Sequence, residues 1–187
     1  MKGLIVWLFG LSGAGKTTIS LLLQDKLHSR GLQTILLDGD QLRAGLNKDL
    51  TFSDADRLEN VRRVAEIAKL VTQSNIVTIC SCITPMEEYR VLARDIIGKG
   101  KLLEVFVDCP LHICEQRDVK GLYKRARENS IENFTGISAP FERPDDCDLI
   151  IRTDQYSPLE CVEHILELID DGNKAIKSTS TYKTRVQ

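Results

Sequence analysis

Neither an excess of charge nor a long hydrophobic run marks this 187-residue sequence, and both shortages exclude classes of protein. Lys and Arg number 25 against 27 Asp and Glu, a formal net charge of -2, so the chain lacks the basic surplus typical of nucleic-acid binding. No apolar stretch reaches the roughly 20 residues that span a bilayer. The apolar residues after Met1 lack a signal-peptide cleavage site. These absences predict a soluble, cytoplasmic protein with neither nucleic-acid nor membrane partners.

Cysteine never occurs in the C-x-x-C spacing of zinc and redox sites, although the chain has six of them. Two of the six alternate within one apolar segment, as small core residues do on a strand. We therefore expect reduced, structural cysteines without a redox function. They are Cys80, Cys82, Cys109, Cys114, Cys147 and Cys161.

Apolar strand patterns alternate with helical patterns along the chain. Strands are predicted at 3–9, 34–40, 76–83, 102–108 and 148–153, and helices after residue 17, over 53–74 and 85–97, and from 110 and 157. This order is typical of an α/β protein with a parallel sheet of about five strands flanked by helices. The length suits one core, so we expect a single domain over 1–172 and a polar C-terminal tail over 173–187.

The stretch FGLSGAGKTT contains the phosphate-binding spacing G-x-x-x-x-G-K-[ST] between a predicted strand and a predicted helix. Lys16 would lie at the β- and γ-phosphates, and Thr17 would coordinate Mg²⁺. The pattern predicts a P-loop that binds a nucleoside triphosphate together with Mg²⁺. The expected nucleotide contacts are Gly10, Leu11, Ser12, Gly13, Ala14, Gly15, Lys16, Thr17 and Thr18.

Polar residues follow the predicted strands where an open α/β sheet binds its ligands. Asp38 and Asp40 end the second strand, and a carboxylate there can accept a proton or hold Mg²⁺ through water. The triplet Asn47-Lys48-Asp49 is one residue shorter than the base-reading N-K-x-D motif of GTPases. Phosphoryl transfer to a second small molecule is therefore favoured over GTP hydrolysis.

The acceptor pocket is predicted around Arg43, Phe52, Arg57 and Asn60. Two guanidinium groups beside an aromatic ring suit an anionic ligand with a flat ring. Alternatively these arginines pair with nearby carboxylates on a wet surface, and the residue pattern leaves both interpretations open.

The segment over about 120–143 begins with a basic cluster and continues with Gly and Pro. It could act as a lid that excludes water and stabilises phosphate charge. A solvated helix followed by a surface loop is the alternative. The cluster consists of Lys120, Lys124, Arg125 and Arg127.

Several blocks together resemble the adenylylsulfate kinase (APS kinase) family over about residues 3–168. They are GLSGAGKTT, LLDGDQLRAGL, FSDADRLENVRRVAEIAKL, ITP, EVFVDCPLHICEQRDVKGLYKRAR and NFTGI. The resemblance implies a P-loop kinase fold with ATP and Mg²⁺ as cofactors. It implies transfer of the γ-phosphate of MgATP to the ribose 3′-hydroxyl of adenosine 5′-phosphosulfate, as part of sulfate assimilation. It also implies a homodimer.

The resemblance assigns roles residue by residue. Asp40 would position or deprotonate the 3′-hydroxyl, with Lys16 and Asp38 as further catalytic residues and with Thr17 and Asp38 on the metal side. Arg117 would lie against the ATP adenine, and Ser81 would have a polar role near the metal. Phe52 and Phe134 could sandwich the acceptor adenine. The acceptor contacts implied are Asp40, Arg43, Phe52, Arg57, Asn60, Ile83, Thr84, Lys120, Asn133 and Phe134.

Three residues depart from the family pattern: Gln41, Thr51 and Cys82. None removes a charged contact, so the departures bear on substrate affinity more than on reaction type. Two rival functions stay open, namely another small-molecule kinase of the same fold, and a nucleotide-dependent switch without turnover.

Overall fold

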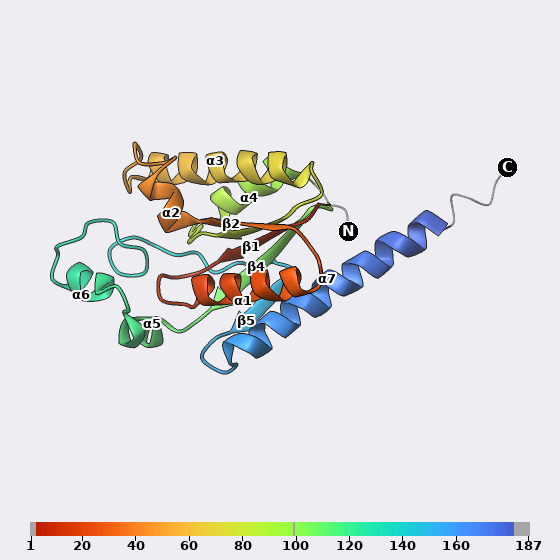
Figure 1. Cartoon of the computed structure of the whole chain (residues 1–187). Coiled ribbons are helices and arrows are strands. Elements are labelled where there is room, and N and C mark those ends of the chain that lie inside the picture. Colours follow the sequence, from red (N-terminus) through yellow and green to blue (C-terminus); the bar gives the residue numbers. More distant parts are fainter. Residues whose placement is uncertain (1–2, 99, 182–187) are drawn as a thin grey trace.

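Five parallel strands form one sheet in the order β2-β3-β1-β4-β5 (Figure 1). The computed structural model describes residues 3–98 and 100–181, with side chains up to residue 171. The strands are β1 (Ile5–Phe9), β2 (Thr34–Asp38), β3 (Val77–Ser81), β4 (Leu102–Asp108) and β5 (Leu149–Arg152). In register, Val6 pairs with Ile79 of β3 and with Leu103 of β4. The predicted five-stranded parallel sheet is confirmed.

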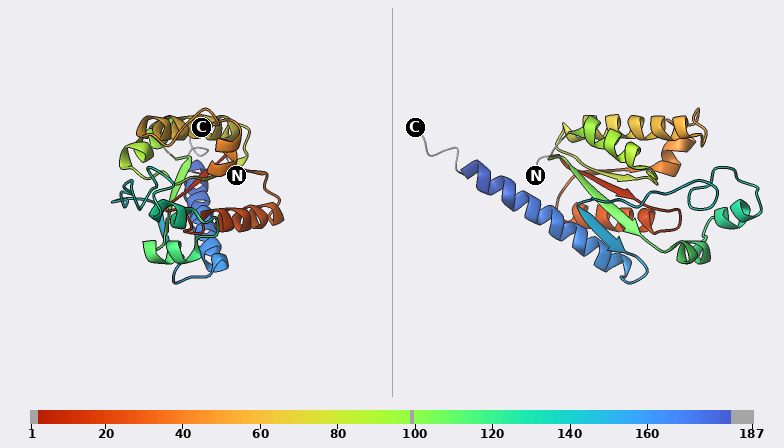
Figure 2. Two further views of the ribbon diagram at one scale, coloured as in Figure 1. Left: turned by 90° about the vertical axis from the view of Figure 1, so that its left-hand side faces the viewer. Right: turned by 180° about the vertical axis from the view of Figure 1, so that it is seen from behind.

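The central strand β1 forms because its residues are apolar and suited to burial on both faces. Val6 and Leu8 face the layer of helices α1 (Lys16–Ser29) and α7 (Pro158–Thr181). Ile5, Trp7 and Phe9 face the opposite layer of α3 (Asp54–Thr72) and α4 (Glu87–Ile97). The two layers are seen on either side of the sheet in Figure 2.

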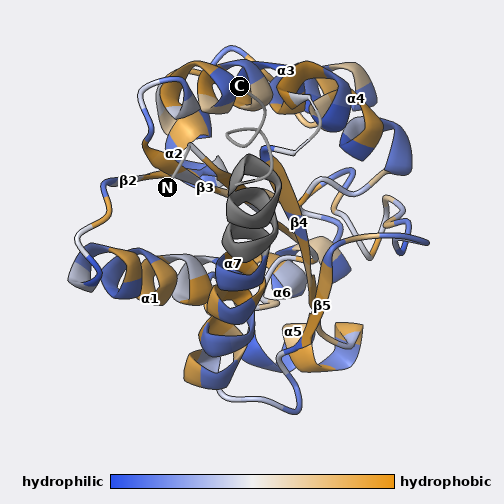
Figure 3. Cartoon of the chain, turned by 90° about the vertical axis from the view of Figure 1, so that its right-hand side faces the viewer, coloured by the Kyte–Doolittle hydropathy of each residue, from blue (hydrophilic) through white to orange (hydrophobic). Residues whose placement is uncertain are grey.

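Helix α7 is amphipathic and extends further than the sequence predicts. Its apolar stripe, which includes Val162, Ile165 and Ile169, packs against the core, and Figure 3 shows both hydrophobic and hydrophilic colours along α7. The helix continues past Gly172, the expected end of the domain, to Thr181. An interior glycine costs a helix only about 1 kcal/mol, which is too little to end it. The remaining tail, 182–187, lies outside the described residues.

The order of the strands places the phosphate loop where the chain reverses direction across the sheet. From β1 the chain crosses past β3 to β2, whereas from β3 it crosses past β1 to β4. The loop after β1 therefore lies at the topological switch point, where open α/β sheets bind ligands. Three short helices gather at the same end (Figure 1): α2 (Gly39–Ala44), α5 (Leu111–Arg117) and α6 (Leu122–Arg127).

Helix α2 corrects one sequence-based expectation. The second strand ends at Asp38, not at Asp40, and Asp40 lies in the first turn of α2. The Asp38 carboxylate accepts hydrogen bonds from the backbone N–H groups of Asp40 and Gln41, so it caps the helix and turns the chain out of the sheet.

All six cysteines are free thiols, and five of them are buried, as the sequence predicts. Burial raises the pKa of Cys82 to about 12, which keeps this thiol neutral at physiological pH. Within residues 3–98 and 100–181, no group of three or more His, Cys, Asp or Glu side chains is placed to hold a metal ion. No helix in that part of the chain has the length and hydrophobicity to cross a membrane.

Candidate active site

The phosphate loop adopts a backbone that requires glycine. Gly10, Gly13 and Gly15 have φ angles of 148°, 73° and 105°, values that side chains disfavour. A Cβ on Gly10 would lie 2.4 Å from the Val107 carbonyl oxygen. The loop can therefore fold closely against β4 and direct its N–H groups toward an anion at the N-terminus of α1.

Lys16 begins α1 and folds back over the loop. Its Nζ donates hydrogen bonds to the carbonyl oxygens of Gly10 (2.9 Å) and Leu11 (2.7 Å). Burial lowers the pKa of Lys16 to about 8, and the negative groups around it, Asp38 and Asp40 among them, act in the opposite direction. A bound phosphate would supply the negative charge that this buried ammonium lacks.

Asp38 links the phosphate loop to α2. One carboxylate oxygen caps α2, and the other accepts a hydrogen bond from Thr17 Oγ1 at 3.2 Å. A hydroxyl and a carboxylate are oxygen ligands of the kind that Mg²⁺ prefers, with phosphate and water completing its shell. The residues present therefore fit Mg²⁺ with Thr17 and Asp38 on its protein side.

Asp40 projects into the mouth of the site, where its side chain is 71% exposed. It forms an ion pair with Lys120, whose side chain is 58% exposed. Because both groups are solvated, the pair contributes little stability. The contact does bring the segment before α6 over the end of β2.

Arg43 and Arg57 both place their guanidinium groups near the Phe52 ring. The guanidinium carbons are 4.4 Å and 5.5 Å from the ring centroid. Arg57 also donates to the Thr135 hydroxyl at 3.0 Å and to the Asn133 carbonyl oxygen. Burial lowers the pKa of both arginines, but a guanidinium stays charged in proteins.

The alternative that Arg43 and Arg57 pair with nearby carboxylates on a solvated surface does not describe these two arginines. Arg43 bonds the backbone oxygen of Thr51 at 2.9 Å, and no salt bridge links Arg43 or Arg57 to a carboxylate within the described residues. The alternative does describe Arg63, which forms ion pairs with Glu59 and Asp49 on the surface.

Thr84 is held in a strained conformation at the end of β3. Its φ is 43°, which is uncommon for a β-branched residue. The Trp7 indole N–H donates to Thr84 Oγ1 at 2.9 Å, and Arg90 donates to the Thr84 carbonyl oxygen at 3.2 Å. Nearby, the buried Ser81 hydroxyl has no hydrogen-bond partner in the described part of the chain.

Arg117 spans the other end of the site. It donates to the carbonyl oxygen of Thr153 at 2.6 Å, and Thr153 Oγ1 donates to the Ala14 carbonyl oxygen at 2.8 Å. These bonds tie the loop after β5 to the phosphate loop. Sequence reasoning missed Thr153, although its position directly after a strand was a usable signal.

One cavity of about 650 Å³ unites most of the predicted residues. Sequence reasoning also missed Tyr123 and Tyr156 in its wall, because an isolated tyrosine on a helix or loop carries no motif. The predicted residues that line it are Ser12, Gly13, Gly15, Lys16, Thr17, Thr18, Asp38, Asp40, Arg43, Phe52, Arg57, Asn60, Ser81, Ile83, Thr84, Arg117 and Lys120.

Asn133 and Phe134 are not part of the cavity wall, and neither are Gly10, Leu11 and Ala14. The Phe134 ring instead packs edge-on against Tyr123, with 5.0 Å between centroids. The proposed sandwich of the acceptor adenine between Phe52 and Phe134 stays a prediction.

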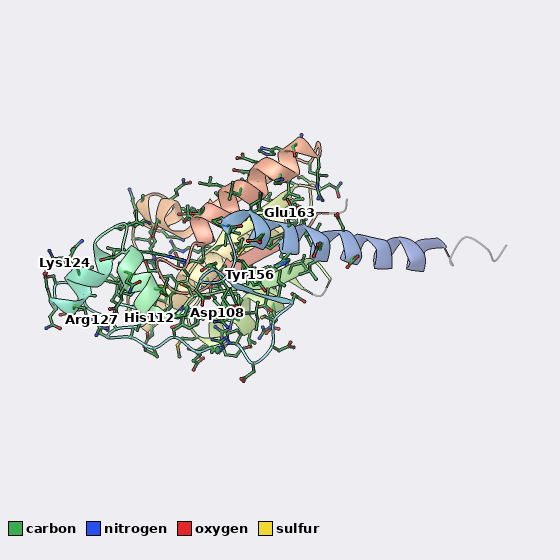
Figure 4. The ribbon with its side chains drawn as sticks, turned by 90° about the horizontal axis from the view of Figure 1, so that it is seen from below. Asp108, His112, Lys124, Arg127, Tyr156 and Glu163 are labelled. Atoms are coloured by element: carbon green, nitrogen blue, oxygen red, sulfur yellow. The ribbon has the colours of Figure 1, made fainter. Side chains whose placement is uncertain are left out.

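The segment over 120–143 is fastened at both ends. The Tyr123 hydroxyl donates to the Ser12 carbonyl oxygen at 2.8 Å, and the Phe141 ring stacks on Phe106 with 5.8 Å between centroids. Lys124 and Arg127 lie on α6 at the outer end of the molecule (Figure 4), and Arg127 pairs with Glu115. Of the basic cluster, only Lys120 lines the cavity.

Together the parallel sheet, the glycine loop with its lysine and the facing aspartate define a phosphotransferase of the P-loop kinase class. The adenylylsulphate kinase family model matches residues 2–152. The chain belongs to this family.

Similar proteins support the assignment. An adenylyl-sulfate kinase of Bacteroides thetaiotaomicron is 51% identical over 165 residues, which cover 88% of this chain and 82% of that protein. A probable adenylyl-sulfate kinase of Bacillus subtilis is 44% identical over 170 residues, 91% and 85% of the two chains. The structure of the Mycobacterium tuberculosis APS kinase CysC in complex with AMPPNP and APS has a TM-score of 0.88 at 42% identity, and the match covers 90% of this chain and 98% of that one.

Proposed function

We propose that this protein transfers the γ-phosphoryl group of MgATP to the ribose 3′-hydroxyl of adenosine 5′-phosphosulfate, giving 3′-phosphoadenosine 5′-phosphosulfate and ADP. The observation that carries the proposal is the position of Asp40. It lines one cavity together with the phosphate loop and with the cluster of Arg43, Phe52 and Arg57. A donor and an acceptor nucleotide would meet at this carboxylate.

Each part of the cavity has a task in this reaction. The loop amides and Lys16 hold the triphosphate, while Arg43 and Arg57 bind the anionic phosphosulfate and Phe52 offers a face for the adenine. Asp40 accepts the hydrogen of the 3′-hydroxyl and orients its oxygen for in-line attack. Bound Mg²⁺ would neutralise charge on the β- and γ-phosphates.

The segment over 120–143 acts as a lid in this proposal. Lys120 reaches Asp40 across the cavity mouth, and in the ternary complex it would turn to the acceptor. The lid would exclude water from the transferred phosphoryl group, which otherwise could react by hydrolysis. The outer cations of α6 remain on a solvated surface.

Three further expectations rest on family resemblance and composition. They are a homodimer, a cytoplasmic location and a single domain over 1–172. The assembly can be measured by light scattering on the eluting protein, with a single mass of twice 21.0 kDa as the expected result.

The reaction is tested with a panel of acceptors at constant MgATP. We expect ADP and a 3′-phosphorylated product with adenosine 5′-phosphosulfate and no comparable turnover with nucleosides or sugar acids. A solved sugar kinase and a solved gluconokinase share the fold at 21% and 18% identity, so sugars and sugar acids are the rival acceptors to test. Efficient phosphorylation of one of those instead would refute the proposal.

A further inference from the structure

Asn47 is a fully buried polar residue in the turn after α2, and the reaction above gives it no role. Its side chain is 0% exposed, and its Nδ2 donates to Asn60 Oδ1 at 3.0 Å. Its own oxygen, Oδ1, has no hydrogen-bond partner in the described part of the chain. The side chain therefore makes one polar contact, and that contact is with a residue of the cavity wall.

The backbone around Asn47 is fixed by other groups. The Asn47 N–H donates to the Leu42 carbonyl oxygen at 2.8 Å, and the Leu50 N–H donates to the Asn47 carbonyl oxygen at 3.1 Å. Arg63 of α3 fastens the same turn through Asp49 at 2.8 Å. The turn thus keeps its place without the Asn47 carboxamide, which leaves the side chain to act on Asn60.

The bond from Asn47 determines which group Asn60 can offer to a ligand. A carboxamide has an oxygen acceptor on one side and an NH₂ donor on the other. Because Asn47 occupies the oxygen of Asn60, its NH₂ group is the part left for the cavity. The neighbouring Arg43 and Arg57 are also donors, so these three side chains together offer hydrogen-bond donors to a ligand.

We propose that Asn47 is a positioning residue that holds the Asn60 carboxamide with its NH₂ group toward the acceptor nucleotide. The proposal rests on the function proposed above and deepens it. Asn60 would donate to an oxygen or ring nitrogen of adenosine 5′-phosphosulfate, and free rotation of its amide would present the wrong group about half of the time.

A purely structural role predicts a different cost. The unpaired buried Oδ1 of Asn47 destabilises the fold. A leucine of similar size at position 47 removes this oxygen and, at the same time, deletes the hydrogen bond to Asn60. If Asn47 served packing alone, Asn47→Leu would leave acceptor binding unchanged. Stability and acceptor binding therefore separate the two roles.

The experiment is a double-mutant cycle on the ADP-loaded protein, with acceptor affinity measured by calorimetry. We expect Asn47→Leu to weaken adenosine 5′-phosphosulfate about tenfold, the scale of one hydrogen bond, and to leave ATP affinity unchanged. Asn60→Ala should weaken the acceptor at least as much, and the double variant should match Asn60→Ala alone. Lys48→Ala, at the exposed neighbouring position, is the control.

Asn47→Ala gives a second variant if the leucine is not accommodated. It should lower the thermal midpoint because it leaves a cavity, and it should weaken the acceptor to the same extent. Unchanged acceptor affinity in both variants, or additive losses in the cycle, would overturn the proposal while leaving the kinase function intact. Failure of the wild-type protein to bind adenosine 5′-phosphosulfate would instead overturn the function and this inference with it.

Discussion

Asp38 and Asp40 are two residues apart, yet the structure predicts losses of stability of different size when each is removed. Asp38 is 6% exposed, caps α2 and accepts the Thr17 hydroxyl. Asp40 is largely exposed and, within the described residues, its ion pair is with the solvated Lys120. Alanine at each position therefore tests whether structure and chemistry are divided between the two carboxylates.

For Asp38→Ala, the lost cap costs about 1 kcal/mol and the lost hydrogen bond about another 1 kcal/mol. At roughly 2–4 °C for each kcal/mol in a chain of this size, the midpoint of thermal unfolding should fall by about 4–8 °C. For Asp40→Ala the surface pair is worth under about 1 kcal/mol, so the shift should stay below about 4 °C. Scanning calorimetry measures both.

The loss of the Asp40 carboxylate should lower the rate strongly even though it costs little stability. Asp40→Asn keeps the shape of the side chain and removes its ability to accept a proton. General-base groups contribute about 10²–10⁴-fold, so kcat should fall by that factor while both nucleotides still bind. Equal melting shifts for the two alanine variants, or an Asp40→Asn protein with more than about a tenth of the wild-type kcat, would refute this division of roles.

Three further changes test other parts of the site. Gly13→Ala would place a Cβ 3.0 Å from the Cys114 carbonyl oxygen at a φ of 73°, so ATP affinity measured by calorimetry should fall at least tenfold. Hydrogen bonds from two arginines of α3 lower the pKa of Glu59 from 4.5 to about 2. Its contribution to stability is therefore complete above pH 4.5 and lost as pH falls toward 2, and Glu59→Gln should flatten that acid limb in unfolding followed by circular dichroism. Lys120→Met should change the free energy of unfolding by less than about 1 kcal/mol but raise KM for the acceptor, because the cation that contacts Asp40 is lost. An unchanged KM would exclude Lys120 from the acceptor site.

The sequence predicts the sheet well because each strand is an apolar run between turn signals. The strand β1 is buried on both faces and consists of five consecutive apolar residues. A run of that length suits a strand and is too short for a typical helix. Helix α2 is missed for the opposite reason. Its residues Gly39–Ala44 bury no side chain, so no periodicity exists to find, and only the Asp38 cap marks its start.

Motif spacing also predicts much of the cavity, since the phosphate loop and the strand ends are local features. The position of Phe134 is not local. Asn133 and Thr135, on either side of it, bond the Arg57 side chain, while its ring packs on Tyr123. A sequence gives the residue types, but it does not show whether the Phe134 ring packs near Phe52 or on Tyr123.

The same bonds suggest how the two substrate halves of the cavity are coupled. Arg57 contacts both Phe52, through its Nε and the Phe52 carbonyl oxygen, and the lid residues Asn133 and Thr135. An anionic acceptor would compete for this guanidinium, because a charged partner outweighs neutral carbonyl and hydroxyl acceptors. Binding of the acceptor would then release the segment around Phe134 from its present contacts. Since that segment leads back through Tyr123 to the Ser12 carbonyl oxygen of the phosphate loop, a change at the acceptor would also reach the triphosphate through the protein.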